Sequence, residues 1–228
     1  GDRLAVAPGI DQATRAFLAG LDADQYERTT FPVDDLEWRM WSNTSSYQRQ
    51  GVSFEEMTEE QRNLAFDLMR AGLSARGFRT SRDIMRLNGH LAWLLENPDR
   101  YGEFHYYLTV MGDPHPTEPW GWQLDGHHLV VNYFVLGDQV VMTPTFMGSE
   151  PTVAEEGPWA GTEILREEQT QALAFMAGLG PEQREVAVLE VSKPGNNALA
   201  QAFRDNLVLD YAGLRGSALG DGQREELL

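Results

Sequence analysis

The sequence predicts an α+β fold, in which an antiparallel β-meander over about residues 103–147 packs against N- and C-terminal helices. Three observations predict it. Apolar residues recur at helical spacing before residue 97 and again after residue 164. Between these stretches the period changes to two, in runs rich in aromatic and β-branched residues. Because no internal repeat or low-complexity tract is present, we expect a single domain over residues 1–228.

The N-terminal third carries three predicted helices. The first covers 10–21, where apolar residues have helical spacing. The second covers 58–77, begins with a Thr-x-x-Gln capping box and is expected to end at its glycine. The third covers about 81–96 and ends before an Asn-Pro pair. The stretch 32–51 is aromatic and polar without a clear period, which is typical of irregular structure or a short strand.

The middle of the chain carries four predicted strands, over 103–112, 120–126, 127–136 and 139–147. Gly137-Asp138 joins the last two and is typical of a two-residue hairpin turn of the primed type. After a Pro- and Gly-rich loop, the pattern returns to helix. Helices are expected up to Gly180, from Pro181 onward, and at the end of the chain.

Composition limits the partners that the protein can have. A chain of 228 residues with 42% hydrophobic residues can bury a core, and a net charge of -17 without a basic stripe excludes nucleic acid. No apolar stretch is long enough to insert into a membrane. The absence of cysteine excludes disulfides, thiolate metal sites and a cysteine nucleophile. A small-molecule ligand is the partner that remains, whereas the oligomeric state is not fixed by the sequence. The chain begins Gly1-Asp2 without methionine, which hints at export after loss of a leader.

All five histidines lie between His90 and His128, and two are adjacent in "DGHHLVVNYF". In a regular strand, neighbouring side chains point to opposite faces, so His127 is expected on the apolar core face and His128 on the other. The hairpin register then joins His128 to a polar column that is either a half-wet sheet face or the floor of a covered cleft. The members of this column are His128, Asn132, Thr143 and Thr145. The two histidines can share a ligand only if Gly126 loosens the start of the strand.

These patterns assign candidate roles to nine residues. The predicted catalytic residues are His128, Asn132 and Glu150. The predicted substrate-binding residues are Arg39, Trp122, Thr143 and Thr145. The predicted metal ligands are His127, His128 and His105, a set that is compatible with a divalent metal ion although the spacing does not demand one. Asp125 either orients an imidazole or bonds backbone amides in a turn, and the turn is favoured.

Two functions are consistent with these residues. The first is a metal-dependent enzyme, a hydrolase or an oxidoreductase, with a histidine-centred cleft on the sheet. The second is a non-catalytic ligand-binding or accessory protein. Its mark would be one aromatic-rich cleft lined by Trp120, Trp122, Tyr106, Tyr107 and Trp159.

Several segments carry a family resemblance that covers nearly the whole chain. "WGWQLDGHHLVVNYFVLGDQVVMTPTFMGSEP", followed by "GPWAG" and preceded by "RMWSN" and "DIMRLNGHL", resembles the domain-of-unknown-function 3500 family. The resemblance implies a bacterial protein, often exported. It carries over no catalytic role, because the family is uncharacterised. Members usually continue through a further section with its own histidines, so the resemblance implies either a form truncated at its C-terminus or a longer protein of which this sequence is a part.

Overall fold

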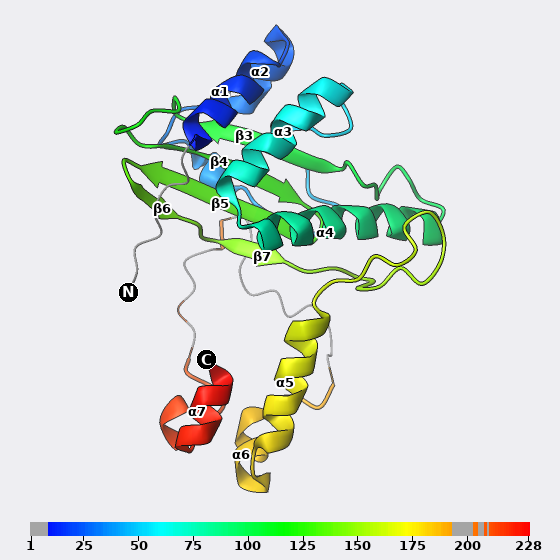
Figure 1. Cartoon of the computed structure of the whole chain (residues 1–228), viewed down its shortest axis with the longest axis vertical. Coiled ribbons are helices and arrows are strands. Elements are labelled where there is room, and N and C mark those ends of the chain that lie inside the picture. Colours follow the sequence, from blue (N-terminus) through cyan, green and yellow to red (C-terminus); the bar gives the residue numbers. More distant parts are fainter. Residues whose placement is uncertain (1–8, 193–202, 205–207, 209) are drawn as a thin grey trace. The chain divides into compact units, whose positions relative to one another are not determined.

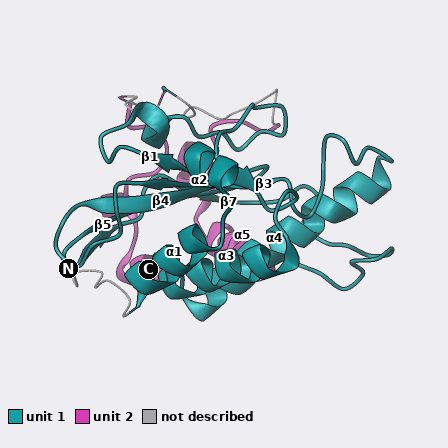
Figure 2. Cartoon of the chain, turned by 90° about the horizontal axis from the view of Figure 1, so that it is seen from above, with its two compact units in different colours: residues 1–164, 201–203 teal, residues 165–200, 204–228 magenta. Residues whose placement is uncertain are grey.

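A computed structural model describes residues 9–192, 203–204, 208 and 210–228. It divides into two compact units, Gly1–Ile164 with Gln201–Phe203, and Leu165–Ala200 with Arg204–Leu228 (Figure 2). The expected α+β class is confirmed, since helices accompany a seven-stranded, mostly antiparallel sheet. That the whole chain is one domain stays a prediction. The two units are therefore described separately.

The sheet belongs to the first unit. Its strands are β1 (Thr30–Phe31), β2 (Val52–Ser53), β3 (Tyr106–Met111), β4 (Trp120–Gly126), β5 (Leu129–Leu136), β6 (Gln139–Val141) and β7 (Thr145–Met147). The strand order is β1-β3-β4-β5-β6, with β2 also paired to β3 and β7 also paired to β5. The predicted hairpin turn at 137–138 is confirmed, because Leu136 pairs with Gln139 across it.

The helices of the first unit are α1 (Ile10–Ala19), α2 (Ala23–Thr29), the short 3-10 helix η1 (Leu36–Arg39), α3 (Glu59–Gly72) and α4 (Ala75–Leu94). The predicted capping box is confirmed, because the side chains of Thr58 and Gln61 each accept a backbone N–H from the other. The expected end of this helix at Gly77 is wrong. α3 ends earlier, and Gly77 lies in the first turn of α4, where its N–H is capped by the Ser74 hydroxyl at 3.0 Å.

Both faces of the sheet are covered, as Figures 1 and 2 show. Helices α1, α3 and α4 lie over one face, where Trp122 is buried against Gly72. On the other face, the Trp38 ring of η1 packs edge-on against Phe134 at 6.0 Å. Every residue of β4 is therefore buried, and its polar side chains Gln123 and Asp125 lie on a covered face of the sheet.

The predicted register of the last hairpin is wrong by one residue beyond its first pairs. β5 pairs with β6 as expected, but Val131, and not Val130, pairs with Thr145. Residues 142–144 lie between β6 and β7 and add one position to that side of the hairpin. Because strand side chains alternate, this shift moves Thr145 to the opposite face from the one predicted, and Thr143 is not in a strand.

The expected strand over 127–136 is also corrected at its start. β4 ends at Gly126 and β5 begins at Leu129, and these two residues pair with each other. His127 and His128 therefore form the two-residue turn of a hairpin, and His128 has a left-handed φ of 59°. Strand alternation does not apply to turn residues, so the assignment of these histidines to opposite faces was wrong.

The second unit is helical where it is described. It contains α5 (Arg166–Gly178), α6 (Pro181–Ala187), the 3-10 helix η2 (Gly216–Ala218) and α7 (Asp221–Leu227). Pro181 is the first residue of a helix, as predicted. The amides of Gln183 and Gln223 donate to each other's oxygens at 3.0 and 2.9 Å, which joins the starts of α6 and α7. Among all described residues, no helix is both long enough and apolar enough to cross a bilayer.

Candidate functional site

A polar pocket of about 490 Å³ lies at the end of the β3–β4 ladder and collects side chains from distant parts of the sequence. Its walls are formed by residues of the 45–49 segment and of the 99–105 segment, together with side chains from α4 and from the strand ends. It contains His105 and His127, two of the three predicted metal ligands. The same pocket also holds Tyr107 and two arginines, so most of its surface can form hydrogen bonds.

The sheet register explains why the two histidines meet. Tyr106 pairs with Gly126, so His105 and His127 occupy the next opposed positions, just beyond the paired strands. A Cβ atom at Gly126 would lie 2.1 Å from Cδ1 of Tyr106, so only glycine lets this ring cross the strand. The Tyr106 hydroxyl reaches the His127 carbonyl and donates to it at 2.9 Å. Gly126 thus allows close packing, whereas the sequence had suggested a loosened strand.

The hydrogen position on the His127 ring is fixed by Asn88 of α4. The Asn88 amide nitrogen donates to the carbonyl oxygen of Gly102 at 2.7 Å, and a carbonyl can only accept. The Asn88 oxygen must therefore face Nδ1 of His127, 2.9 Å away. Nδ1 carries the hydrogen of the neutral ring, and Nε2 keeps the lone pair for a ligand.

The His127 ring is uncharged at neutral pH. Burial lowers its pKa from 6.5 to about 3, and the positive charges of His128, Arg49 and Arg100 lower it further in the same direction. A ring with so low a pKa takes up a proton poorly but accepts a hydrogen bond well. Its chemistry is therefore that of a fixed acceptor.

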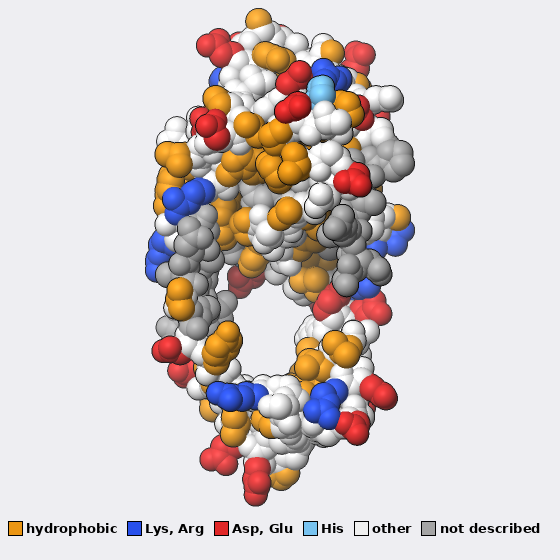
Figure 3. Space-filling view, turned by 90° about the vertical axis from the view of Figure 1, so that its left-hand side faces the viewer, with side chains coloured by type: hydrophobic (Ala, Val, Ile, Leu, Met, Phe, Trp, Pro, Cys, Tyr) orange, Lys and Arg blue, Asp and Glu red, His pale blue; other side chains and the backbone are white. Residues whose placement is uncertain are grey.

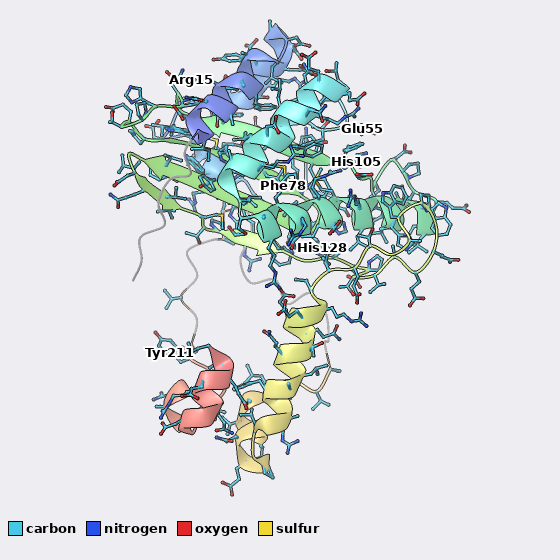
Figure 4. The ribbon with its side chains drawn as sticks, in the orientation of Figure 1. Arg15, Glu55, Phe78, His105, His128 and Tyr211 are labelled. Atoms are coloured by element: carbon cyan, nitrogen blue, oxygen red, sulfur yellow. The ribbon has the colours of Figure 1, made fainter. Side chains whose placement is uncertain are left out.

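His105 is held in a different way. Its Nε2 lies 2.7 Å from a carboxylate oxygen of Glu55, and Figure 4 shows the two side chains next to each other. The carboxylate accepts Nε2–H, which leaves Nδ1 as the ring nitrogen with the lone pair. The His105 side chain is 19% exposed and Glu55 is 65% exposed, so the pair is open to solvent on the carboxylate side. Glu55 is placed to stabilise positive charge on this ring when it takes up a proton.

A buried ion pair holds one wall of the pocket. The Nε of Arg49 lies 3.2 Å from the carboxylate of Asp125, and the two side chains are 4% and 5% exposed. The guanidinium also donates to the carbonyls of Ser42, Thr44 and Tyr47, so it fastens the 42–47 loop to β4. The turn that the sequence favoured for Asp125 is wrong, because this residue lies inside a strand. Its partner Arg49 lies on a loop far from Asp125 along the chain, and no local pattern indicates that the two residues pair.

Two buried carboxyl groups near this wall have raised pKa values. Burial raises the pKa of Asp125 to about 7, against the opposing effect of Arg49 and of two backbone N–H groups. Burial likewise raises the pKa of Glu37 to about 7, where a hydrogen bond from Gln50 opposes it and the charge of Asp125 adds to it. Sequence reasoning missed Glu37. The aromatic residues around it, Trp38 and Trp41, were the only sign of burial.

His128 lies beside the pocket and is not part of its lining. Its ring is 4.1 Å from the His127 ring, centroid to centroid, and stacks on Phe146 at 6.1 Å. Its backbone N–H donates to the Asn43 carbonyl at 2.9 Å, and its carbonyl accepts from Gly148 at 2.9 Å. The turn therefore brings the two histidine rings together, which the strand prediction had excluded.

Two other predicted site residues lie in the core. Asn132 is buried, accepts from the Gln123 amide at 2.6 Å and donates to the Pro144 carbonyl at 3.0 Å. Trp122 is fully buried and stacks on Tyr133 at 5.2 Å. Because their surroundings are protein groups, their contacts explain packing and hydrogen bonding within the fold. The other aromatic residues expected in one cleft separate in the same way, since Trp120 and Tyr106 are buried and Trp159 is bonded to Glu103.

The remaining predicted residues lie away from the polar pocket. Thr145 lines an apolar pocket of about 570 Å³ beside β5–β7, and Thr143 is exposed. Glu150 lines a third pocket together with His90. The Arg39 guanidinium lies 5.4 Å from the Phe203 ring centroid. The predicted constellation is therefore divided among several sites.

The three histidines predicted as metal ligands do not assemble into a metal site. Throughout the described ranges, no group of three His, Asp or Glu side chains is arranged to hold a metal ion. Nε2 of His105 is bonded to Glu55 and Nδ1 of His127 to Asn88, so each ring offers one remaining nitrogen.

Comparison with known proteins gives one match. The family model "Protein of unknown function (DUF3500)" matches residues 5–228. No curated protein and no solved structure matches the chain.

Proposed function

The chain belongs to the DUF3500 family, whose description assigns no activity, and from the site alone we propose that it is a hydrolase of a small polar substrate. The polar pocket is the proposed active site. The observation that carries the proposal is the pair of histidines with different, fixed hydrogen positions in one pocket. His105 directs Nε2–H to Glu55, and His127 directs Nδ1–H to Asn88. Two imidazoles in one pocket that each keep a different ring nitrogen for a ligand are suited to hold a water molecule and a substrate group.

In the proposed reaction, His105 is the general base. Its Nδ1 takes a proton from a water molecule as the water oxygen bonds to the carbonyl carbon of an ester or amide. Glu55 stabilises the charge that develops on the ring. The bond from carbon to the leaving group then breaks, and the same proton passes from His105 to that group. His127 stays uncharged and orients the water or a substrate hydroxyl through Nε2.

A metal-dependent hydrolase or oxidoreductase in the same pocket is the second candidate. Metal-bound histidines usually bond their other ring nitrogen to a carboxylate or amide, and both pocket histidines have such a partner. A catalytic zinc needs about three protein ligands, however, and the described residues bring no third His, Asp or Glu to these two rings. The acid–base proposal needs no further ligand, so we prefer it.

The proposal is tested with purified protein on a panel of small chromogenic esters and anilides. We expect turnover of at least one class, and a fall in kcat/KM of roughly 10²- to 10⁴-fold for His105→Asn. Glu55→Gln should lower kcat by a smaller factor. His115→Asn is the matched control, because His115 is half-exposed and lies outside the pocket lining.

Two outcomes would contradict the hydrolase. One is a panel that is not hydrolysed faster than in buffer. The other is a His105→Asn protein that retains the full rate. In either case the non-catalytic ligand-binding function becomes the better explanation of the pocket. Elemental analysis of the same preparation tests the second candidate, which requires about one equivalent of metal per chain.

A further inference from the structure

We propose that the polar pocket binds a carboxylate group of its substrate through Arg100, an inference that rests on the hydrolase function and narrows its substrate class. The substrate would then be an ester or amide that carries one free carboxylate.

Arg100 is exposed and is held by one hydrogen bond, which leaves the outer edge of its guanidinium unused. Its Nε donates to the Ser45 hydroxyl at 3.0 Å, and its guanidinium lies 5.3 Å from the Tyr101 ring centroid. In the described part of the chain, its two Nη nitrogens make no hydrogen bond or ion pair with a protein group. Other arginines are paired, as Arg82 is with Glu103 at 2.9 Å. A planar guanidinium edge binds the two oxygens of a carboxylate through parallel hydrogen bonds.

The second pocket arginine does not compete for this role. The Arg49 guanidinium is buried, pairs with Asp125 and donates to three loop carbonyls, so it is held by the protein on each of its nitrogens. Arg49 is therefore a wall of the pocket, and Arg100 is the positive group that a ligand can reach. Both residues line the same cavity.

Hydroxyl-bearing residues line the same pocket as Arg100. They are Ser46, Tyr47 and Tyr107. The acidic side chains of the lining are Glu55 and Asp99, and Glu55 is already bonded to His105. Hydroxyl groups can donate to the oxygens of a carboxylate, so these side chains can add to the hydrogen bonds from Arg100.

The charge of the chain distinguishes a carboxylate from a phosphate. The net charge is -17, and Asp and Glu side chains are spread over the face of the first unit in Figure 3. Repulsion of an anion grows with its charge, and a phosphate carries roughly -1.5 to -2 at neutral pH where a carboxylate carries one. Asp99 inside the pocket adds to this repulsion. The site therefore fits a singly charged carboxylate better than a phosphate.

His127 gives an internal reporter of binding. The positive charge of Arg100 contributes to the low pKa of His127, so the two groups are close enough to interact. A carboxylate on Arg100 offsets that charge and should raise the pKa of His127 toward its ordinary value. Binding anywhere else would leave this ring unchanged.

The test is an NMR titration of the full chain with sodium acetate, with acetamide and with inorganic phosphate at constant ionic strength. We expect acetate to shift the Arg100 Nε–H and the His127 ring signals to saturation, and phosphate to bind more weakly. Acetamide should cause no saturable shift. Arg100→Gln should weaken acetate binding at least tenfold. Arg79→Gln, which changes an exposed arginine of α4 outside the pocket lining, should not.

Three results would overturn the inference. They are equal acetate binding by Arg100→Gln, a response to acetamide equal to that of acetate, and tighter binding of phosphate than of acetate. The results that would contradict the hydrolase differ from those that would contradict the carboxylate site. If acetate binds through Arg100 but no ester is hydrolysed, the reaction is wrong and the carboxylate site stands. If hydrolysis requires His105 but its rate does not depend on a substrate carboxylate and is unchanged in Arg100→Gln, the reaction stands and this inference is wrong.

Discussion

Asn88→Asp tests whether the side chain of residue 88 sets the protonation of His127. Asn88 accepts Nδ1–H of His127 at 2.9 Å, and the ring has a pKa of about 3. The substitution keeps the shape of the side chain and puts a carboxylate where a neutral amide had been. An opposite charge at this range raises a histidine pKa by roughly 1–3 units, so we expect a value of about 4–6.

The same substitution has a cost in stability that follows from the Gly102 carbonyl. The amide nitrogen that donates to this carbonyl at 2.7 Å is replaced by an oxygen, so two acceptors face each other. Leaving a buried group unsatisfied costs roughly 1–3 kcal/mol, and we expect a loss of this size in the free energy of unfolding.

The pH dependence has a definite sign. The folded pKa of His127 lies below its unfolded value of 6.5, so the folded protein binds fewer protons between pH 3 and 6.5. His127 therefore contributes stability that is present above pH 6.5 and is lost as the pH falls toward 3. In Asn88→Asp this contribution should shrink, because the folded pKa moves back toward the unfolded one.

The measurement is a two-dimensional ¹H–¹⁵N spectrum of the histidine rings, recorded across pH in the native protein and in Asn88→Asp. Asn63→Asp is the matched control, because Asn63 is exposed on α3 and the substitution is the same. The reasoning is refuted if native His127 carries its hydrogen on Nε2, or if its pKa is the same in the variant as in the native protein.

Three further predictions concern the frame around the pocket. Gly126→Ala should lower the free energy of unfolding by roughly 2–4 kcal/mol in urea denaturation, because the new methyl group overlaps the buried Tyr106 ring. A loss of less than about 0.5 kcal/mol would show that the ring can move aside. Asp125→Asn should cost roughly 3–5 kcal/mol in the same assay, because the buried Arg49 charge loses its partner, and an unchanged midpoint would mean that the loop carbonyls suffice. The pKa of Glu37 is raised to about 7, so the folded protein binds more protons than the unfolded chain from about pH 4.5 to 7. The protein therefore loses stability as the pH rises through this range. Glu37→Gln should make the pH profile of thermal unfolding flatter there, and an unaltered slope would contradict the raised value.

The features that sequence reasoning predicted correctly have local signals. The capping box at Thr58 and the hairpin turn after Leu136 each depend on residues within a few positions of one another. The α+β class follows from the change of hydrophobic period, which is also local.

The features that it missed depend on distant or unusual residues. Two-residue hairpin turns are recognised by glycine, asparagine or aspartate, and here the turn is formed by His127 and His128. The shifted register after residue 141 follows from an extra position in the segment that contains Pro144, a residue type that is confined to strand edges and bulges and was the available sign of an interruption. Of the predicted site, His105 and His127 do line one pocket, but their partners Glu55 and Asn88 come from segments far from either histidine in sequence.

The left-handed backbone of His128 has one consequence for its main-chain hydrogen bonds and another for its ring. A residue with a side chain pays roughly 1–2 kcal/mol to adopt this conformation, and glycine adopts it freely. The main-chain bonds to Asn43 and Gly148 need only the peptide groups, which glycine also has. Glycine would therefore satisfy the main chain of this hairpin at a lower conformational cost. What the imidazole adds is its packing between the His127 ring at 4.1 Å and the Phe146 ring at 6.1 Å, so a single residue both closes the turn and supports the neighbouring pocket histidine.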